Sequence, residues 1–213
     1  MAGVRTIVSV DPRIVAALGA QLRARDPGAR RVGWKIALGI AEIEELIGPA
    51  PVIGNLTSAT QLEDGATYRG GGPLHADAEV VIEAGTGGLG VGLELVDLTR
   101  PPGGAEAIVA ANVLHRAFVL GASRPGAVPG EGALIVNGEV RARAPAVVDV
   151  DGTLRAVARW LAAVGEELRP GDRVFAGSVV QVPVAPGDRV AAAISGLGRV
   201  EVAVADERGV SCS

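Results

Sequence analysis

Glycine and proline interrupt the chain at short intervals after Pro51, and this punctuation limits the fold more than any other feature. The 213 residues include 31 glycines and 13 prolines. Between these breakers stand short β-rich segments, as is typical of strands joined by turns; they span 52–53, 79–82, 92–98, 133–136, 173–175, 190–194 and 199–205. The sequence therefore predicts an α+β, mostly β fold with a curled mixed sheet rather than a doubly wound one.

Four helical patterns accompany the strands. Asp11-Pro12 is typical of an N-cap and a first helical residue, and predicts a short amphipathic helix that ends near 25–28. Further patterns cover 40–47 and 104–116, and a last helix is expected to begin at the N-cap Asp151. Its predicted inner face holds Leu154, Val157, Leu161 and Val164.

Asn137-Gly138 stands between two apolar runs and predicts a hairpin with a type I′ turn. No internal repeat or linker divides the chain, and its length fits one domain. We therefore expect a short N-terminal helical segment over 1–30 and a single domain over 31–213.

Composition excludes several classes of function. Net charge is −4, and two tryptophans, one tyrosine and two phenylalanines leave little for stacking on bases, so we expect no nucleic-acid partner. The single cysteine, Cys212, excludes a disulfide framework and a cysteine-ligated zinc site. No apolar run reaches the length of a membrane span, and no signal peptide opens the chain, so we expect no membrane association and a cytoplasmic location.

Lys35 is the single lysine among 20 basic residues, and it stands between Trp34 and Ile36. Arginine stays charged inside proteins, whereas a lysine in an apolar pocket can lose its proton near neutral pH, as acid–base chemistry requires. The alternative is a lysine at a strand end whose stem covers apolar surface. Composition alone leaves both interpretations open.

Carboxylates stand where two strands should be apolar. Asp77 and Glu79 are two residues apart and so share one face of a strand, while Glu94 lies within the apolar run 91–96. Buried unpaired carboxylates cost several kcal/mol, and neither strand carries a basic residue. Three oxygen ligands without cysteine or clustered histidine suit Mg²⁺ or Mn²⁺. The alternative is that these carboxylates lie on the solvent-exposed face of a half-exposed sheet and pair with distant arginines.

These motifs, in this order, resemble the fumarylacetoacetate hydrolase superfamily, and particularly its 2-oxopent-4-enoate hydratase and 4-oxalocrotonate decarboxylase branch. The resemblance extends from Arg31 to Val204. The segments that carry it are the glycine-aromatic-lysine strand 32–36, the loop 54–57, the metal strand 76–80, the strand of the third ligand 93–97, the segment 119–121 taken as a helix end, and the closing segments 170–178, 186–188 and 196–198.

The resemblance implies a mixed β-sheet roll of the family's C-terminal domain type with a few flanking helices, so that 31–213 is a catalytic domain. It implies Mg²⁺ or Mn²⁺ held by Asp77, Glu79 and Glu94, with Lys35 reaching a small 2-oxo acid. The implied activity is a divalent-metal-dependent lyase that works through a metal-stabilised enolate, most like 2-oxopent-4-enoate (2-hydroxypenta-2,4-dienoate) hydratase, in aromatic catabolism. A 4-oxalocrotonate-type decarboxylase is the first alternative, and an acylpyruvate or fumarylacetoacetate-type hydrolase or isomerase the second. The hydrolase branch usually has a Gly-Thr-Pro turn where this chain has 177–182, which favours the lyases.

Further site residues follow from the same resemblance. Ser178 is expected to hold the substrate carboxylate or a water, and Asn55 and Thr57 to bind substrate from their loop. Arg100 is expected to clamp a substrate carboxylate, with an ordinary surface salt bridge as the alternative. His115, predicted on the helix 104–116, could act as an acid or base, with a structural histidine as the alternative.

Three departures from the family's pattern affect these expectations. The segment before the lysine strand is short, Asp77 replaces the usual glutamate, and Ala111 stands where hydratases commonly have aspartate. These departures leave open the alternative that the protein is a non-catalytic subunit that supports an active paralogue. The resemblance otherwise implies a homo-oligomer.

Overall fold

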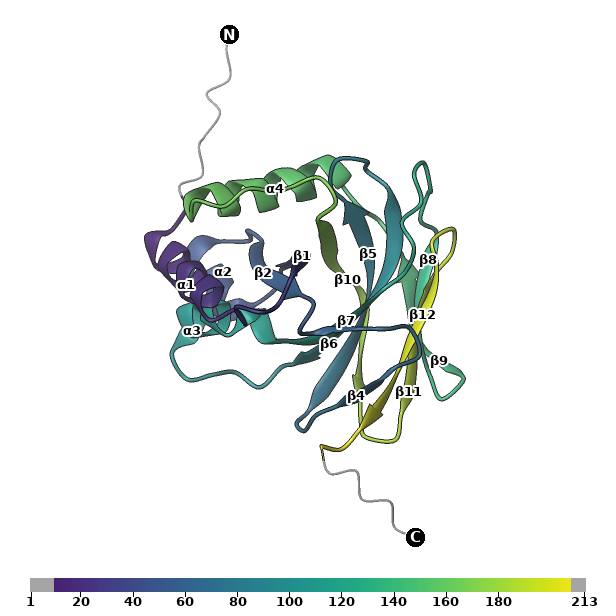
Figure 1. The fold of residues 1–213 in the computed structure, drawn as a ribbon. Helices are drawn as coiled ribbons and strands as arrows, with labels where there is room; N and C mark the ends of the chain where they lie inside the picture. Colours follow the sequence, from purple (N-terminus) through teal and green to yellow (C-terminus); the bar gives the residue numbers. More distant parts are fainter. Residues whose placement is uncertain (1–9, 208–213) are drawn as a thin grey trace.

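The computed structural model describes residues 10–207, and two mixed β-sheets form its body (Figure 1). Cys212 lies outside the described residues. The larger sheet has the order β2-β1-β10-β5-β6-β7-β3, with β1 (Arg31–Ala37), β2 (Val52–Thr57), β3 (Gln61–Leu62), β5 (Leu74–Glu83), β6 (Leu89–Asp97), β7 (His115–Leu120) and β10 (Arg173–Val184). The smaller sheet has the order β4-β12-β11-β8-β9, with β4 (Thr67–Arg69), β8 (Glu131–Val136), β9 (Glu139–Pro145), β11 (Arg189–Ile194) and β12 (Gly198–Ala205).

Helices cover one side of the larger sheet. In Figure 1, α1 (Pro12–Arg23), α2 (Ala41–Ile47) and α3 (Gly104–Ala110) lie together on the left, at the end of the molecule away from the smaller sheet. Helix α4 (Val150–Ala163) crosses the top. The curled, mostly β fold that the sequence predicts is thus confirmed. Buried Ile14 and Leu18 join α1 to the main core, so the N-terminal helix packs as part of the same body. Within residues 10–207 no helix is long and apolar enough to cross a bilayer.

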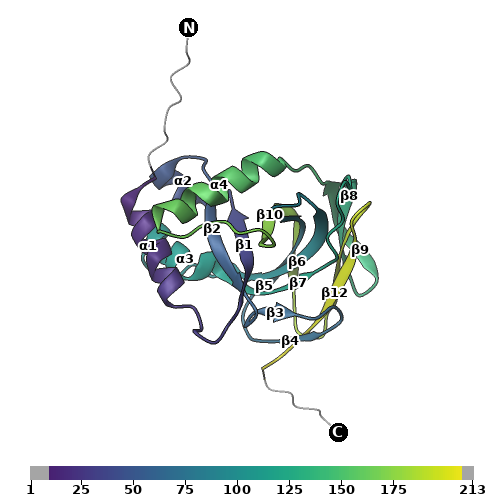
Figure 2. The ribbon, with the colours of Figure 1, turned by 45° about the horizontal axis from the view of Figure 1, so that its top comes forward.

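The larger sheet has two different faces because its long strands alternate. Apolar side chains such as Ala78, Val80 and Leu93 belong to the main core, which also contains Val202 of the smaller sheet. The intervening residues of β5 point to the other face and include Asp77 and Glu79. Figure 2 shows the larger sheet bending, with the smaller sheet closing one side and α4 crossing above. The carboxylates therefore lie inside a curled sheet instead of on a wet outer surface.

Gly33 explains the glycine of the glycine-aromatic-lysine strand. Strand β1 runs parallel to β10 with Gly33 opposite Arg173. A Cβ at Gly33 would lie 1.8 Å from the carbonyl oxygen of Arg173, a distance that no side chain tolerates. Glycine is thus required for the backbone approach that brings β1, and with it Lys35, beside β10.

The predicted helix over 104–116 is wrong in its second half. Helix α3 ends at Ala110, and Asn112, Val113 and Leu114 have φ values of 56°, 51° and 65°. Left-handed backbone breaks a helix, and it is costly for a β-branched residue such as Val113. The side chain of Asn112 stabilises this turn by accepting from the backbone N–H of Asn55 at 2.7 Å and donating to its carbonyl at 2.9 Å. His115 therefore begins a strand, β7, and the segment 119–121 follows it as strand end instead of helix end.

The predicted hairpin turn and the predicted cap of α1 both form, whereas the cap of α4 lies two residues before the predicted one. Asn137 and Gly138 both have positive φ, 53° and 85°, between paired strands β8 and β9, which confirms the type I′ hairpin. Asp11 accepts from the N–H of Arg13 at 2.8 Å and caps α1 as predicted. Helix α4 is capped by Asp149, which accepts from Gly152, and not by Asp151.

Candidate metal and active site

Three buried carboxylates meet on strands β5 and β6. The strands are antiparallel with Asp77 opposite Glu94, and Glu79 opposite Gly92, so all three acidic side chains project from the same face. One oxygen from each lies within 4.8 Å of the others, and none of the three residues is more than 4% exposed. The alternation of β5 and the register with β6 thus assemble an all-oxygen cluster inside the protein.

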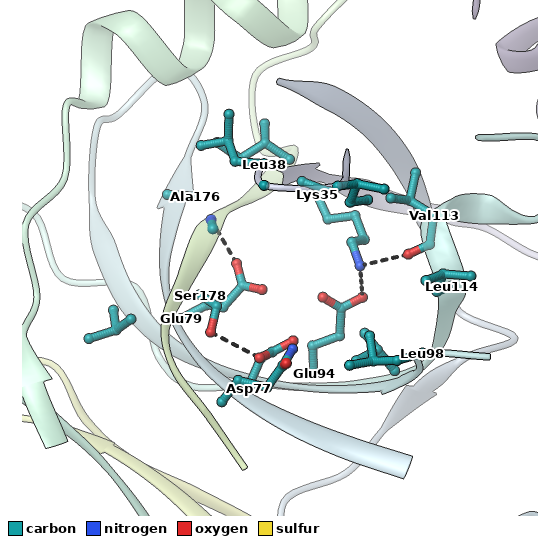
Figure 3. Close-up of a pocket in the computed structure, with 18 of the residues that line it drawn as sticks. Lys35, Leu38, Asp77, Glu79, Glu94, Leu98, Val113, Leu114, Ala176 and Ser178 are labelled. Atoms are coloured by element: carbon teal, nitrogen blue, oxygen red, sulfur yellow. Dashed lines mark hydrogen bonds and ion pairs between the residues drawn. The ribbon is translucent and has the colours of Figure 1, made fainter. Parts of the chain in front are cut away.

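Lys35 reaches this cluster from β1. Its Nζ donates to Glu94 Oε1 at 2.5 Å and to the carbonyl oxygen of Val113 at 3.3 Å (Figure 3). Its neighbours Trp34 and Ile36 point to the opposite face, since adjacent residues of a strand do so. Lys35 is therefore buried against the carboxylate cluster and the left-handed turn.

A bulge in β10 supplies two more hydrogen bonds to the carboxylates. The pairing of β10 with β5 shifts between Phe175 and Ser178, where Gly177 has a φ of 100°. The backbone N–H of Gly177 donates to Glu79 at 2.8 Å, and the Ser178 hydroxyl donates to Asp77 at 2.9 Å (Figure 3). Each strand of the site thus contributes a defined donor or acceptor.

Burial and mutual repulsion raise two of the three carboxylate pKa values. Burial, with the charge of Glu94, raises the pKa of Asp77 to about 6. Burial and the same charge raise the pKa of Glu79 well above its ordinary value. Burial also works to raise the pKa of Glu94, but Lys35 and His115 outweigh it and lower that pKa to about 2. Glu94 therefore stays ionised, while the other two resist ionisation for want of positive charge.

His115 lies behind Glu94 and not in the cavity. Its Nδ1 is 2.6 Å from Glu94 Oε1, and its Nε2 is 2.9 Å from the Thr60 hydroxyl. Burial lowers the pKa of His115 against the opposing effect of Glu94, so the ring is neutral near pH 7. Because ionised Glu94 can only accept, Nδ1 carries the proton and Nε2 accepts from Thr60. The ring thus positions Glu94.

The residues present fit a hard divalent cation. Asp77, Glu79 and Glu94 offer oxygen ligands of the kind that Mg²⁺ and Mn²⁺ prefer, and among the described residues Lys35 is the one positively charged side chain in contact with them. Neutral His115 adds no positive charge. The raised pKa values of Asp77 and Glu79 express the same shortage of positive charge that a divalent ion would remove.

The cluster forms the floor of a cavity of about 460 Å³. Of the predicted site residues, Lys35, the three carboxylates, Ser178 and Arg100 line it. Arg100 lies near the mouth, where its Nε donates to Glu42 at 3.1 Å. The cavity is thus open at one end and has its buried acidic floor at the other.

Three predicted or suspected positions lie elsewhere. Asn55 does not line the cavity, because its side-chain amide is committed to Gln21 and Asn112, each at 3.1 Å. Thr57 is buried near the end of β2, also away from the cavity. Ala111 is exposed at the end of α3 and does not line the cavity, so the absence of an aspartate there removes nothing from this wall.

Sequence reasoning missed the Gly177 N–H, Gln181, Asn112 and Glu42. Gln181 lies opposite Asp77 in the register of β10 with β5 and lines the cavity. A bulge and a left-handed turn leave little trace in sequence, so the roles of Gly177 and Asn112 could not be found there. Glu42 is one of three glutamates on a short helix and carries no signal of its own in sequence, since its partner Arg100 is 58 residues away.

Comparison with known proteins finds likeness in structure alone. No protein-family model matches the sequence, and no curated protein matches it. The 4-oxalocrotonate decarboxylase from Pseudomonas putida G7, solved with magnesium and adipate, is 18% identical with a TM-score of 0.69 over 92% of this chain and 98% of that one. The fumarylpyruvate hydrolase from Pseudomonas aeruginosa, solved with Mn²⁺ and pyruvate, is 22% identical with a TM-score of 0.56 over 84% and 90%.

A third solved structure, 2-hydroxyhepta-2,4-diene-1,7-dioate isomerase from Mycobacterium marinum, is 19% identical with a TM-score of 0.59 over 85% of this chain and 78% of that one. These proteins differ in reaction but share an architecture. The chain therefore has the fold of the fumarylacetoacetate hydrolase superfamily, as its motifs predict.

Proposed function

We propose that the protein is a divalent-metal-dependent lyase acting on a small 2-oxo acid, most like 2-oxopent-4-enoate hydratase. One observation carries the proposal: three buried carboxylates within 4.8 Å of one another share a cavity with Lys35, whose Nζ is 2.5 Å from one of them. Two of the structural relatives are solved with magnesium or manganese and a small carboxylate, which supports the same class of ligand here.

Asp77, Glu79 and Glu94 would hold Mg²⁺ or Mn²⁺. When bound, such an ion supplies positive charge opposite the carboxylate and keto oxygens of a 2-oxo acid and stabilises negative charge that develops as the substrate enolises. The Ser178 hydroxyl and the Gly177 N–H keep Asp77 and Glu79 oriented through one oxygen of each. Ser178 also faces the cavity. While its proton goes to Asp77, its oxygen would hold a water by accepting from it, and it would hold the substrate carboxylate only by turning its proton away from Asp77.

In the proposed reaction, Lys35 is the group that transfers a proton to the substrate. Its Nζ projects from β1 over the cluster and is held between Glu94 and the Val113 carbonyl. From that position it delivers a proton to the carbon chain of a dienol as the enol hydroxyl gives one up. The resulting conjugated ketone then accepts water in a hydratase. General acid–base groups of this kind contribute about 10²- to 10⁴-fold to a rate.

A 4-oxalocrotonate-type decarboxylase is the second candidate. It is favoured by the P. putida decarboxylase, which is matched over 98% of its length. In this reaction the electrons left by carbon dioxide pass into the same enol system, and Lys35 again supplies the proton to carbon. Acylpyruvate hydrolysis and isomerisation use the same enolisation and follow as further candidates.

The proposal is tested by turnover after metal removal. Protein stripped with EDTA is incubated with 2-hydroxypenta-2,4-dienoate or 4-oxalocrotonate, with and without Mn²⁺, and the products are identified by NMR. We expect metal-dependent conversion of the dienoate to a hydrated 2-oxo acid. Failure of any 2-oxo acid to turn over with metal would contradict the proposal.

The homo-oligomer implied by the resemblance remains part of the proposal, and a mass measurement in solution tests it. The alternative of a non-catalytic subunit in a complex with an active paralogue predicts that Lys35→Ala leaves the activity of the assembled complex unchanged. A large loss in that complex would reject the alternative.

A further inference from the structure

The cavity changes character from its floor to its mouth. The floor consists of side chains that are almost fully buried, namely the three carboxylates and Lys35. Leu38 and Val147 line the same cavity but are 55% and 89% exposed, so they mark its mouth. Further apolar lining residues are Ile40, Leu98, Pro145 and Val179. A ligand whose head lies on the floor would therefore extend its tail along apolar side chains.

Arg100 is the one cationic side chain besides Lys35 among the described residues of the cavity wall, and Glu42 already holds it. Its Nε donates to Glu42 Oε1 at 3.1 Å, and a second guanidinium nitrogen donates to the Leu98 carbonyl at 3.5 Å. The second oxygen of Glu42 is buried without a hydrogen-bond partner. Moving Arg100 to a ligand would leave the whole Glu42 carboxylate without its cation.

Helix α2 adds no positive charge beside this pair. It contains no basic residue, and its other glutamates, Glu44 and Glu45, are exposed and do not line the cavity. A carboxylate at the end of a ligand's tail would therefore approach an arginine that is already paired, and it would meet the negative charge of Glu42. Repulsion of this kind is a common way of rejecting a wrong ligand.

We propose that the cavity selects 2-oxo acids whose tail is uncharged and apolar, and that Glu42, through its pair with Arg100, rejects a second carboxylate. The inference rests on the proposed function, which puts the 2-oxo acid head on the floor. It assigns Arg100 to a structural pair in place of a substrate clamp. It also separates this chain from relatives solved with adipate or named for a 1,7-dioate, since both of those molecules are dicarboxylates.

Calorimetry on the Mn²⁺-loaded protein tests the selectivity with three acids. Pyruvate reports the head group alone, and 2-oxohexanoate and 2-oxoadipate have equal carbon chains that end in a methyl group or a carboxylate. We expect 2-oxohexanoate to bind about tenfold more tightly than 2-oxoadipate. Glu42→Gln should raise the affinity for 2-oxoadipate about fivefold and change that for 2-oxohexanoate less than about twofold.

Two variants assign the effect to the pair. Glu44→Gln removes one charge from the exposed face of the same helix, and it should leave the preference unchanged. The double variant Glu42→Gln with Arg100→Met should lose the gain for 2-oxoadipate, because the freed guanidinium is then absent.

The outcomes separate this inference from the proposed function. If pyruvate binds but wild-type protein takes 2-oxoadipate as tightly as 2-oxohexanoate, the selectivity is overturned and the proposed function stands. The role of Glu42 is overturned if Glu42→Gln behaves like Glu44→Gln. Failure of pyruvate to bind the metal-loaded protein would refute the proposed function, and this inference with it.

Discussion

Glu94 receives both of its hydrogen-bond donors on one oxygen. Lys35 Nζ and His115 Nδ1 lie 2.5 and 2.6 Å from Oε1, which leaves the other oxygen turned toward Asp77 and Glu79 (Figure 3). Two donors on one side fix the rotation of the carboxylate. The amine and the imidazole therefore have separate tasks, since Lys35 lines the cavity and His115 does not.

Replacing Lys35 should abolish chemistry and spare the ion. Lys35→Met keeps the length of the side chain but removes the proton, so we expect turnover to fall by about 10²- to 10⁴-fold. Mn²⁺ affinity should not weaken, because the variant removes positive charge near the carboxylates. Steady-state kinetics and titration of Mn²⁺ by electron paramagnetic resonance measure the two effects. A parallel loss of metal would show that Lys35 only maintains the site.

Replacing His115 should instead weaken metal binding. His115→Ala removes the donor that orients Glu94, and the loss of such a partner typically costs about 10- to 100-fold in metal affinity. His115→Asn places an amide N–H near the position of Nδ1 and should recover part of the loss.

Arg116→Gln is the matched control for His115. Arg116 is the next residue of β7 and pairs with Asp97 at 3.0 Å, away from the cluster, so its loss should leave Mn²⁺ affinity unchanged. Equal affinities for His115→Ala and wild type would contradict the positioning role.

At the scale of elements, predictions based on neighbouring residues succeed where the structure is set locally. The Asn137-Gly138 hairpin and the Asp11 cap depend on four or five consecutive residues, and both form as predicted. The common face of Asp77 and Glu79 follows from strand alternation alone.

Features that depend on distant segments could not be predicted in this way. The end of α3 depends on a hydrogen-bonded pair between Asn112 and Asn55, which are 57 residues apart. Apolar residues at 113, 114 and 117 suggest a helical pattern in sequence, but that tertiary contact turns the chain into β7 instead. The same contact binds the side chain of Asn55 to Asn112, and Asn55 does not line the cavity.

Gly54 tests how tightly the left-handed turn packs on β2. A Cβ there would lie 2.9 Å from both Lys35 Cγ and the Asn112 side-chain oxygen. Gly54→Ala should therefore destabilise the protein by about 1–3 kcal/mol, as overpacking does, and lower turnover by displacing Lys35. Denaturant unfolding and kinetics measure both effects.

Gly71→Ala is the matched control for Gly54→Ala. No atom lies within 4 Å of a Cβ at Gly71, and its backbone is not left-handed. Stability should stay the same or rise slightly, because alanine restricts the unfolded chain. If both variants were equally stable, β2 and the turn would pack more loosely than the structure indicates.

For the whole molecule, the buried acidic cluster makes stability depend on pH and on metal. Asp77 binds a proton more tightly in the folded protein than in the unfolded one, since its pKa is raised to about 6. Stability of the metal-free protein therefore falls as pH rises from the ordinary aspartate pKa through 6, by up to roughly 3 kcal/mol for this group. Glu94 acts oppositely, but its contribution is complete above its ordinary pKa and is lost only as pH falls toward 2.

Thermal unfolding between pH 5 and 7.5 tests this balance. In EDTA the melting temperature should fall across the range, and Mn²⁺ should raise it most at pH 7.5; an ion at 100 times its dissociation constant adds about 2.7 kcal/mol. Asp77→Asn should flatten the fall in EDTA and reduce the gain with Mn²⁺. A wild-type profile in EDTA that matches Asp77→Asn would refute the assignment.

The acidic floor is built on the paired central strands β5 and β6, whereas several residues of the mouth, including Leu38, Arg100 and Val147, lie outside the strands. Mutations at the mouth can therefore accumulate without disturbing the strand register that assembles the carboxylates. Under the proposed function, substitutions at the mouth would change which acids are accepted while the chemistry of the floor is kept. The fold thus separates the part of the protein that selection must preserve from the part in which new specificities can evolve.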